Sequence, residues 1–217
     1  MDLDDLRALI SVIDHGSAAA AAAATRTSRT TLRRRLENLE AQVGVPLLIR
    51  GTAGAVPTPA GLALAARGRT LVEEAYRRIR EIEAGLHLED LPPEDALRKL
   101  VAFTVDYQLA NPDFIRLVMT ENIHRGEYLA QSKLIQKLNV PAIEGLRQVY
   151  ERGARAGVFR AGLDPVDLHM SISALSFFNT ANRHTFALIF KRDLEAPAAV
   201  AARRDTIVEM IVRFVRR

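Results

Sequence analysis

The chain has 217 residues, of which 48% are apolar and 26% charged, and this composition is ordinary for a globular protein with a buried core. No apolar run reaches the roughly 18 residues that a membrane-spanning helix needs, and the first residues are acidic where a signal peptide carries Lys or Arg. We therefore expect a cytoplasmic protein without a membrane partner. Cysteine is absent and no two histidines form a helical i, i+4 pair, so we predict no metal site and no cofactor.

The net charge of +4 is mild but unevenly distributed. Residues 1–70 hold nine Arg against six acidic residues, whereas the remainder holds 21 Lys and Arg against 20 acidic residues. Within the N-terminal part, one stretch concentrates Arg26, Arg29, Arg33, Arg34, Arg35 and Arg50. Such a cluster is typical of surfaces that bind nucleic-acid phosphates, although a charge run alone is more often a solvated helix face.

Three short helices are predicted in the first 44 residues. The first, which ends at Gly16, repeats its apolar residues at helical spacing: Leu3, Leu6, Ile10 and Ile13. Ser17 opens a run of seven alanines, which we interpret as a closely packed second helix because alanine is the best helix former. Ser28 caps a third helix that ends at Gly44 and whose buried stripe is predicted to be Leu32, Leu36, Leu39 and Val43. This succession is the helix-turn-helix pattern.

A short hairpin and a long helix are expected next. VPLLIRGTAGAVPTP, residues 45–59, contains two short extended runs around Gly51 and Gly54. Thr58 and Pro59 supply the N-cap and first residue of a helix that we expect to reach about Ala84, on the order of 40 Å. This helix is too long to belong to the small N-terminal part alone.

Every segment after residue 60 has helical periodicity, which excludes a doubly wound α/β domain. Glu94 and Asp95 are interpreted as first-turn charges that suit a helix dipole. The helix that opens at Asp164-Pro165 and includes LHMSISALSFFNTANRHTFALIF is apolar on more than one side, as is the last helix, so a second copy of the chain is a candidate cover. Breaks are expected at Pro92-Pro93, Asn111-Pro112, Pro141, Gly153 to Gly162, Asp164-Pro165 and Pro197.

The third helix is two-sided. Its leucines fall on one face and its polar residues collect on the opposite one. Because the DNA major groove admits one α-helix, we predict that the N-terminal part reads base edges through Ser28, Arg29, Thr30, Arg33 and Arg34. Arg35 points towards the edge of the core stripe and is assigned to packing or an ion pair. At the hairpin tip, Arg50 and Thr52 are predicted to touch phosphate or the minor groove.

These residues carry a resemblance to a known family. LDDLRALISVIDHGS, SRTTLRRRLENLEAQVGVPLLIR and TPAG resemble the winged helix-turn-helix of LysR-type transcriptional regulators, over about residues 2–72. The resemblance implies that helix 28–43 lies in the major groove of double-stranded DNA, that the hairpin acts as a wing and that the long helix pairs two subunits. The sequence departs from the family pattern in its alanine run and in Ala53, where the wing often has another arginine, and reduced wing contact is the expected cost.

The remainder, about residues 73–217, resembles the C-terminal regulatory domain of TetR-type repressors. The resemblance rests on EEAYRRIREIEAGLHLEDLPPEDALRKLVAFTVDY, NPDFIRLVMTENIHRG and GVFRAGLDPVDLHMSISALSFFNTANRHTFALIF. The join lies near Thr70 to Glu74, inside the long helix. We therefore expect a mainly α fold with two domains, a winged helix-turn-helix in residues 1–72 and an all-α TetR-like bundle in residues 73–217.

A TetR-like domain implies a small-molecule effector held inside the bundle. Polar and aromatic residues among apolar ones are the candidates, although each taken alone is more simply a packed core residue. The candidate set is Phe103, Tyr107, Asn122, Arg125, Tyr128, Phe178, Asn182 and Thr185. His124 and His184 have no carboxylate or nucleophile at a supporting spacing, so we predict no catalytic residue and no enzyme activity.

The last two long helices resemble the pair that forms the dimer interface of TetR-type proteins, with some residues alternatively lining the subunit's own core. The interface candidates are Leu168, Ile172, Leu175, Ile207, Ile211 and Phe214. The leading hypothesis is a homodimeric transcriptional regulator that reads a two-fold symmetric operator and responds to an effector, with repression following the TetR resemblance and activation the LysR one. The alternative is a ligand-independent DNA-binding protein whose bundle only dimerises.

Overall fold

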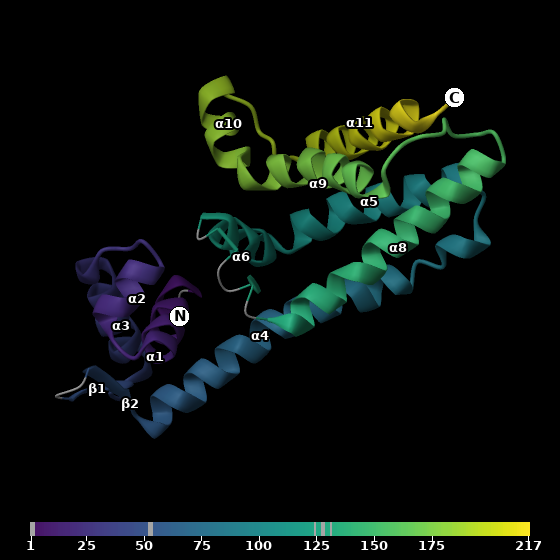
Figure 1. Cartoon of the computed structure of the whole chain (residues 1–217). Coiled ribbons are helices and arrows are strands. Elements are labelled where there is room, and N and C mark those ends of the chain that lie inside the picture. The colour runs from purple at the N-terminus through teal and green to yellow at the C-terminus, as the bar shows by residue number, and fades with distance from the viewer. Residues whose placement is uncertain (1–2, 52–53, 124, 127–128, 131) are drawn as a thin grey trace. The chain divides into compact units, whose positions relative to one another are not determined.

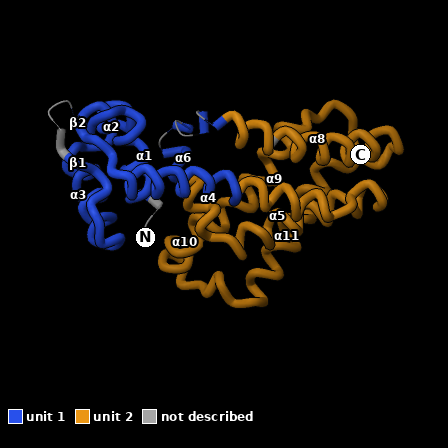
Figure 2. The backbone as a smooth tube through the Cα atoms, turned by 90° about the horizontal axis from the view of Figure 1, so that it is seen from below, with its two compact units in different colours: residues 1–75, 120–132 blue, residues 76–119, 133–217 orange. Residues whose placement is uncertain are grey.

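The computed structural model describes residues 3–51, 54–123, 125–126, 129–130 and 132–217, which are helical apart from one hairpin, a short 3-10 turn and the connecting loops (Figure 1). It contains two compact units, residues 1–75 with 120–132 and residues 76–119 with 133–217 (Figure 2). The predicted fold class is confirmed: a helix-turn-helix with a two-stranded hairpin precedes a long helix and a helical bundle. None of the helices in the described part of the chain is long and apolar enough to cross a membrane.

The first unit follows the predicted order of elements. Helices α1 (Leu3–His15), α2 (Ala18–Ala24) and α3 (Arg29–Val43) precede the antiparallel strands β1 (Leu48–Gly51) and β2 (Gly54–Pro57) and the long helix α4 (Pro59–Ala84). The predicted caps are confirmed, because Ser17 Oγ accepts a hydrogen bond from Ala20 N and Ser28 Oγ accepts one from Thr31 N. Gly44 ends α3 with a φ of 78°, a conformation that glycine adopts without a Cβ penalty.

Apolar side chains of α1, α2, α3 and the loop before β1 form the core of this unit. The leucines predicted for α3 are buried, but the prediction for Val43 is wrong, since it is 40% exposed at the frayed end of the helix. Helix α4 approaches this core closely. A Cβ on Gly61 would collide with the Leu47 carbonyl, and one on Gly68 with the Leu6 side chain, so both positions need glycine.

A buried ion pair also belongs to the first unit. Arg7 of α1 donates from Nη2 to Glu121 Oε1 over 2.8 Å, and both side chains are less than a tenth exposed. Glu121 Oε2 accepts a second bond from the Leu129 backbone N–H at 3.1 Å. Because two charges removed from water must compensate each other, this pair holds the end of α6 at Glu121 against α1.

The second unit is a bundle around α5 (Pro93–Ala110). The 3-10 turn η1 (Leu88–Asp90) and helices α8 (Lys133–Arg155), α9 (Pro165–Ala181) and α11 (Pro197–Val215) pack against α5 (Figure 1). Helix α6 (Pro112–Ile123) starts in this unit and ends in the first one, and α10 (Arg183–Phe190) follows α9. The core is apolar and includes Leu97, Val101, Leu146, Val149, Ile172 and Val212.

Three expectations are corrected in this unit. Helix α8 runs through the predicted breaks at Pro141 and Gly153, because its apolar face packs on α5 across both positions. The predicted single helix 165–190 is divided at Asn182, whose side-chain amide donates to the Phe178 carbonyl. Glu94 does more than suit the helix dipole. It pairs with Arg216 and Arg98, and the hydrogen bond from Arg216 lowers the pKa of its carboxyl group.

Glu121→Gln will destabilise the first unit by about 3–5 kcal/mol, because the substitution leaves the Arg7 charge buried without its carboxylate. Urea unfolding followed by circular dichroism measures the effect. The control is Glu74→Gln, whose carboxylate makes a longer and solvent-exposed pair with Arg67 and should cost about 1 kcal/mol or less. Equal losses in the two variants would contradict the buried pair.

The two glycines inside α8 predict opposite effects of the same substitution. A Cβ at Gly153 would overlap the buried ring of Phe159, so Gly153→Ala should destabilise the bundle by about 1–3 kcal/mol. A Cβ at Gly145 meets no atom within 4 Å, so Gly145→Ala should stabilise by about 0.5–1 kcal/mol through helix propensity alone. Thermal unfolding of both variants tests the pair.

Candidate functional site

The outer face of α3 concentrates cationic and hydroxyl side chains. Ser28, Arg29, Thr30, Arg33 and Arg34 are all exposed, as the helical period of the sequence predicts. Arg33 forms an exposed ion pair with Glu37 at 3.1 Å, whereas no carboxylate among the described residues pairs with Arg29 or Arg34. Two guanidinium groups on the first turns of one helix are therefore available to a phosphate or a base edge.

Arg35 lies on a different side of α3. Its Nη2 contacts Asp4 Oδ2 of α1 at 2.9 Å, and both side chains are about two-thirds buried or more. The predicted ion pair is thus confirmed. The three adjacent arginines have different surroundings, because a helix turns 100° per residue. Arg33 and Arg34 face outward, and Arg35 faces α1.

A hollow lies beside this cationic face, between α3 and the hairpin. Its wall combines Arg29 and Arg33 with apolar side chains of α1 and β1, including Val12 and Ile49. Ala18 of the alanine helix also borders it, and a methyl group leaves more space than a longer side chain would. The side chain of Arg50 and the whole of Thr52 and Ala53 lie outside the described residues, so the predicted contacts of the hairpin tip stay predictions.

The predicted effector residues that the structure describes belong to different helices and to both units. Phe103 and Tyr107 of α5 are in contact, with ring centroids 5.7 Å apart, and burial raises the pKa of the Tyr107 hydroxyl. Phe178 packs against Phe186 of α10, while Asn182 ends α9 and accepts a bond from Thr185 Oγ1. The exposed Asn122 and Arg125 belong to the other unit, and Tyr128 and His124 lie outside the described residues.

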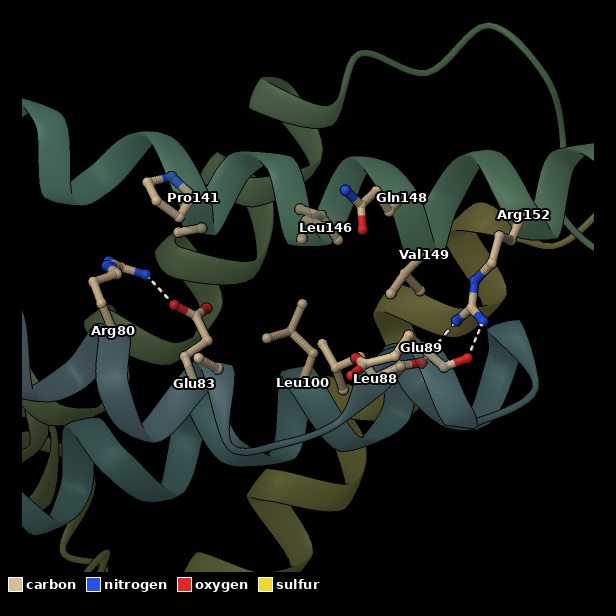
Figure 3. Close-up of a pocket in the computed structure, with 13 residues that line it drawn as sticks. Arg80, Glu83, Leu88, Glu89, Leu100, Pro141, Leu146, Gln148, Val149 and Arg152 are labelled. Atoms are coloured by element: carbon tan, nitrogen blue, oxygen red, sulfur yellow. Dashed lines mark hydrogen bonds and ion pairs between the residues drawn. The ribbon is translucent and has the colours of Figure 1, made fainter.

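A pocket of about 190 Å³ lies elsewhere in the second unit, between the end of α4, η1, α5 and α8 (Figure 3). Its apolar wall includes Leu88, Leu100, Leu146 and Val149. None of the seven predicted effector residues in the described part of the chain lines it. The residue pattern of the sequence did not predict this pocket. One signal was present, because Pro141 and Gly145, both unfavourable inside a helix, stand four residues apart on the face of α8 that lines the pocket.

Charged groups stand at the two ends of the pocket (Figure 3). At one end, Arg80 of α4 is paired with Glu83 through a hydrogen-bonded contact, and both side chains are about 15% exposed. At the other end, Arg152 of α8 donates from Nη1 to the Glu89 carbonyl at 2.6 Å and from Nη2 to the Leu88 carbonyl at 2.7 Å. The pocket is therefore an apolar slot with one compensated and one uncompensated guanidinium.

The predicted dimer-interface residues mostly face inward. Leu168, Ile172, Ile207 and Ile211 are almost fully buried in the core of their own bundle, and Leu175 packs against that core. Phe214 is 47% exposed, with the Arg160 guanidinium 4.0 Å from its ring centroid. The alternative in which such residues line the subunit's own core therefore describes four of the six.

Other apolar side chains of the same helices are exposed. They are Val166, Met170 and Phe178 on α9 and Met210 on α11, with Leu188, Ile189 and Phe190 on the short α10. On α9 and α11 helical period explains the difference, because the outward residues alternate with the buried ones, whereas α10 buries none of its residues.

Comparison with known proteins agrees with this architecture. A family model described as a tetracyclin repressor-like C-terminal domain matches residues 93–211, and one described as a bacterial regulatory helix-turn-helix protein of the lysR family matches residues 3–62. Among curated proteins, the HTH-type transcriptional repressor NicS of Pseudomonas putida is 33% identical over 148 residues, which cover 68% of this chain and 70% of NicS.

Two further relatives match more partially. An uncharacterized HTH-type transcriptional regulator of Mycobacterium tuberculosis is 30% identical over 64% of this chain, and the chain spans only 43% of that protein's length. A crystal structure of CbnR, a LysR family transcriptional regulator, is 34% identical and covers 39% of this chain and 29% of that one, with a TM-score of 0.36.

The outward arginines on a helix-turn-helix and the bundle that follows define a DNA-binding transcriptional regulator. The chain belongs to the family of regulators with a tetracyclin repressor-like C-terminal domain, and it joins that domain to a lysR-family DNA-binding head.

Proposed function

We propose that the protein acts as a homodimer that reads a two-fold symmetric operator through α3 of each copy and changes its DNA affinity when a small molecule binds the second unit. The observation that supports DNA reading is the exposed row of Arg29, Thr30, Arg33 and Arg34 on α3. Two such helices held about 34 Å apart match successive major grooves on one face of a duplex.

The ligand response is supported by the continuity of α4. Gly61 and Gly68 of this helix pack in the first unit, and Arg80, Glu83 and Ala84 of the same helix line the pocket in the second. A ligand that favours one position of the α4 end therefore acts on a helix that continues into the DNA-reading unit. The size of the response is limited by the difference in ligand affinity between the two arrangements. The pocket favours this function over a bundle that only dimerises.

Repression is the mode that the bundle supports, since NicS is named a repressor and covers most of this chain. In this mode the free dimer occupies its operator, and the ligand-bound dimer releases it. The exposed apolar residues Met170, Phe178, Met210 and Phe214 are the surface that we propose for dimerisation, because a second copy would remove them from water.

Arg34→Ala should weaken duplex binding, measured by fluorescence anisotropy over a salt series. Loss of a phosphate contact would reduce the slope of log K against log salt by about 0.9 for each copy, and loss of a base contact would cost about 1–3 kcal/mol. Arg35→Ala is the matched control, because this neighbouring arginine is engaged with Asp4 and should change stability rather than the salt slope. An unchanged affinity in the Arg34 variant would contradict the proposed reading face.

Met210→Lys should convert the dimer to a monomer, because it places a charge in the centre of the proposed apolar interface. Size-exclusion chromatography with light scattering gives the mass. Val140→Lys on α8 is the control, since Val140 is 66% exposed and lies outside the proposed interface, so this variant should keep the dimer mass. A dimeric Met210 variant, or a monomeric wild-type chain, would contradict the interface.

A further inference from the structure

The side of α8 that lines the pocket carries a glycine and a proline, which leave space where larger side chains would fill it. Gly145 stands in the middle of this 23-residue helix, where glycine costs about 1 kcal/mol relative to alanine. A Cβ added at this position would meet no atom within 4 Å, so packing does not require glycine. Gly153 on the same helix is different, because a Cβ there would collide with the ring of Phe159 and packing does require glycine. Pro141, one turn earlier, lines the same pocket and gives up a backbone donor inside the helix.

Among the described residues, no carboxylate is paired with the guanidinium at the Arg152 end. The two bonds that Arg152 makes go to backbone carbonyls of Leu88 and Glu89, which carry no formal charge, and these bonds fix the plane of its guanidinium. The Glu89 carboxylate also borders the pocket, but it is 70% exposed and lies 3.6 Å from His87 Nδ1. The guanidinium of Arg80, at the other end of the pocket, differs because it is already paired with the Glu83 carboxylate. A guanidinium fixed in place at an apolar wall favours a planar carboxylate partner.

The volume sets the size of the apolar part. An apolar cavity of about 150 Å³ holds a benzene molecule, so a pocket of about 190 Å³ fits one ring or a short chain with one polar substituent. Resting on the ligand response proposed above, we propose that the pocket binds a compact monocarboxylate, with its apolar body between Leu100 and Leu146 at Gly145 and its carboxylate on Arg152. Gln148, whose side chain lies between these ends in Figure 3, donates from its amide nitrogen to Glu144 at 3.2 Å and offers its amide oxygen to a further polar substituent.

The test is calorimetric titration of the full chain with benzoate, cyclohexanecarboxylate and hexanoate, each compared with its uncharged amide. At least one acid should bind about tenfold or more tightly than its amide, because only the acid makes a charge-assisted bond to Arg152. Equal affinity within every acid–amide pair, or no binding of any of the six probes, would overturn the proposal.

Variants separate the carboxylate site from general effects of charge. Arg152→Gln should reduce the acid-to-amide ratio to about one, and Arg152→Lys should retain part of it. Arg147→Gln, on the same helix but outside the pocket and paired with Glu144, should leave the ratio unchanged. Gly145→Leu should weaken binding of acid and amide alike, because it adds a bulky side chain at a position that lines the pocket, and the melting temperature of the variant reports whether the bundle is intact. A ratio that survives Arg152→Gln would overturn the assignment.

Duplex binding measured on the same samples distinguishes this proposal from the proposed function. If the chain binds DNA and no acid is preferred, the carboxylate class is wrong and the DNA-binding function stands. If an acid is preferred and depends on Arg152 but leaves duplex affinity unchanged at saturation, the site is right and the ligand response is wrong.

Discussion

Helix α4 must satisfy two buried environments with one continuous backbone. In the first unit its glycines permit contact with Leu47 and Leu6, where any Cβ would collide. In the second unit Tyr76 is buried, its ring is 5.3 Å from that of Phe114, and the helix ends at the pocket. Helix α4 is continuous from Pro59 to Ala84, so no loop lies between its two ends to absorb a displacement of either one. A lysR-type head and a TetR-like bundle can be joined at this point because each needs a helix there.

The division of labour on α3 follows from helical geometry. Three adjacent arginines cannot share a face, so Arg35 supports α1 through Asp4, while Arg33 and Arg34 are exposed on the outer side of the helix. Packing of the leucine face fixes the orientation of the cationic face, since the core and the reading surface lie on opposite sides of a single helix. The proposed DNA contacts should therefore be separable from stability by mutation at neighbouring positions, although both depend on the same helix.

The pocket between α4, η1, α5 and α8 shows a different relation between sequence and structure. Its residues come from α4, η1, α5 and α8, and most of them are ordinary in type. Among the predicted effector residues are Phe103, Tyr107 and Phe178. Each of them packs against another aromatic ring. The pocket instead carries small or helix-weakening residues and two arginines. A pocket forms where several segments of the chain meet, so the sequence of any one segment does not show it. Its only sign in the sequence is a glycine or proline that packing does not require.

Local signals determined most of the elements from the sequence alone. Serine caps, Gly44 and the leucine spacing define the three N-terminal helices, because capping and periodicity involve residues within one or two turns of each other. The sequence likewise determined the class of protein, through motifs that lie close together in the chain. Only the tertiary structure decided that α8 continues through Pro141, that Leu168, Ile172, Ile207 and Ile211 face the core, and that Arg7 is buried against Glu121. The physical reason is that burial and ion pairing depend on segments far apart in sequence, which an individual helix pattern cannot specify.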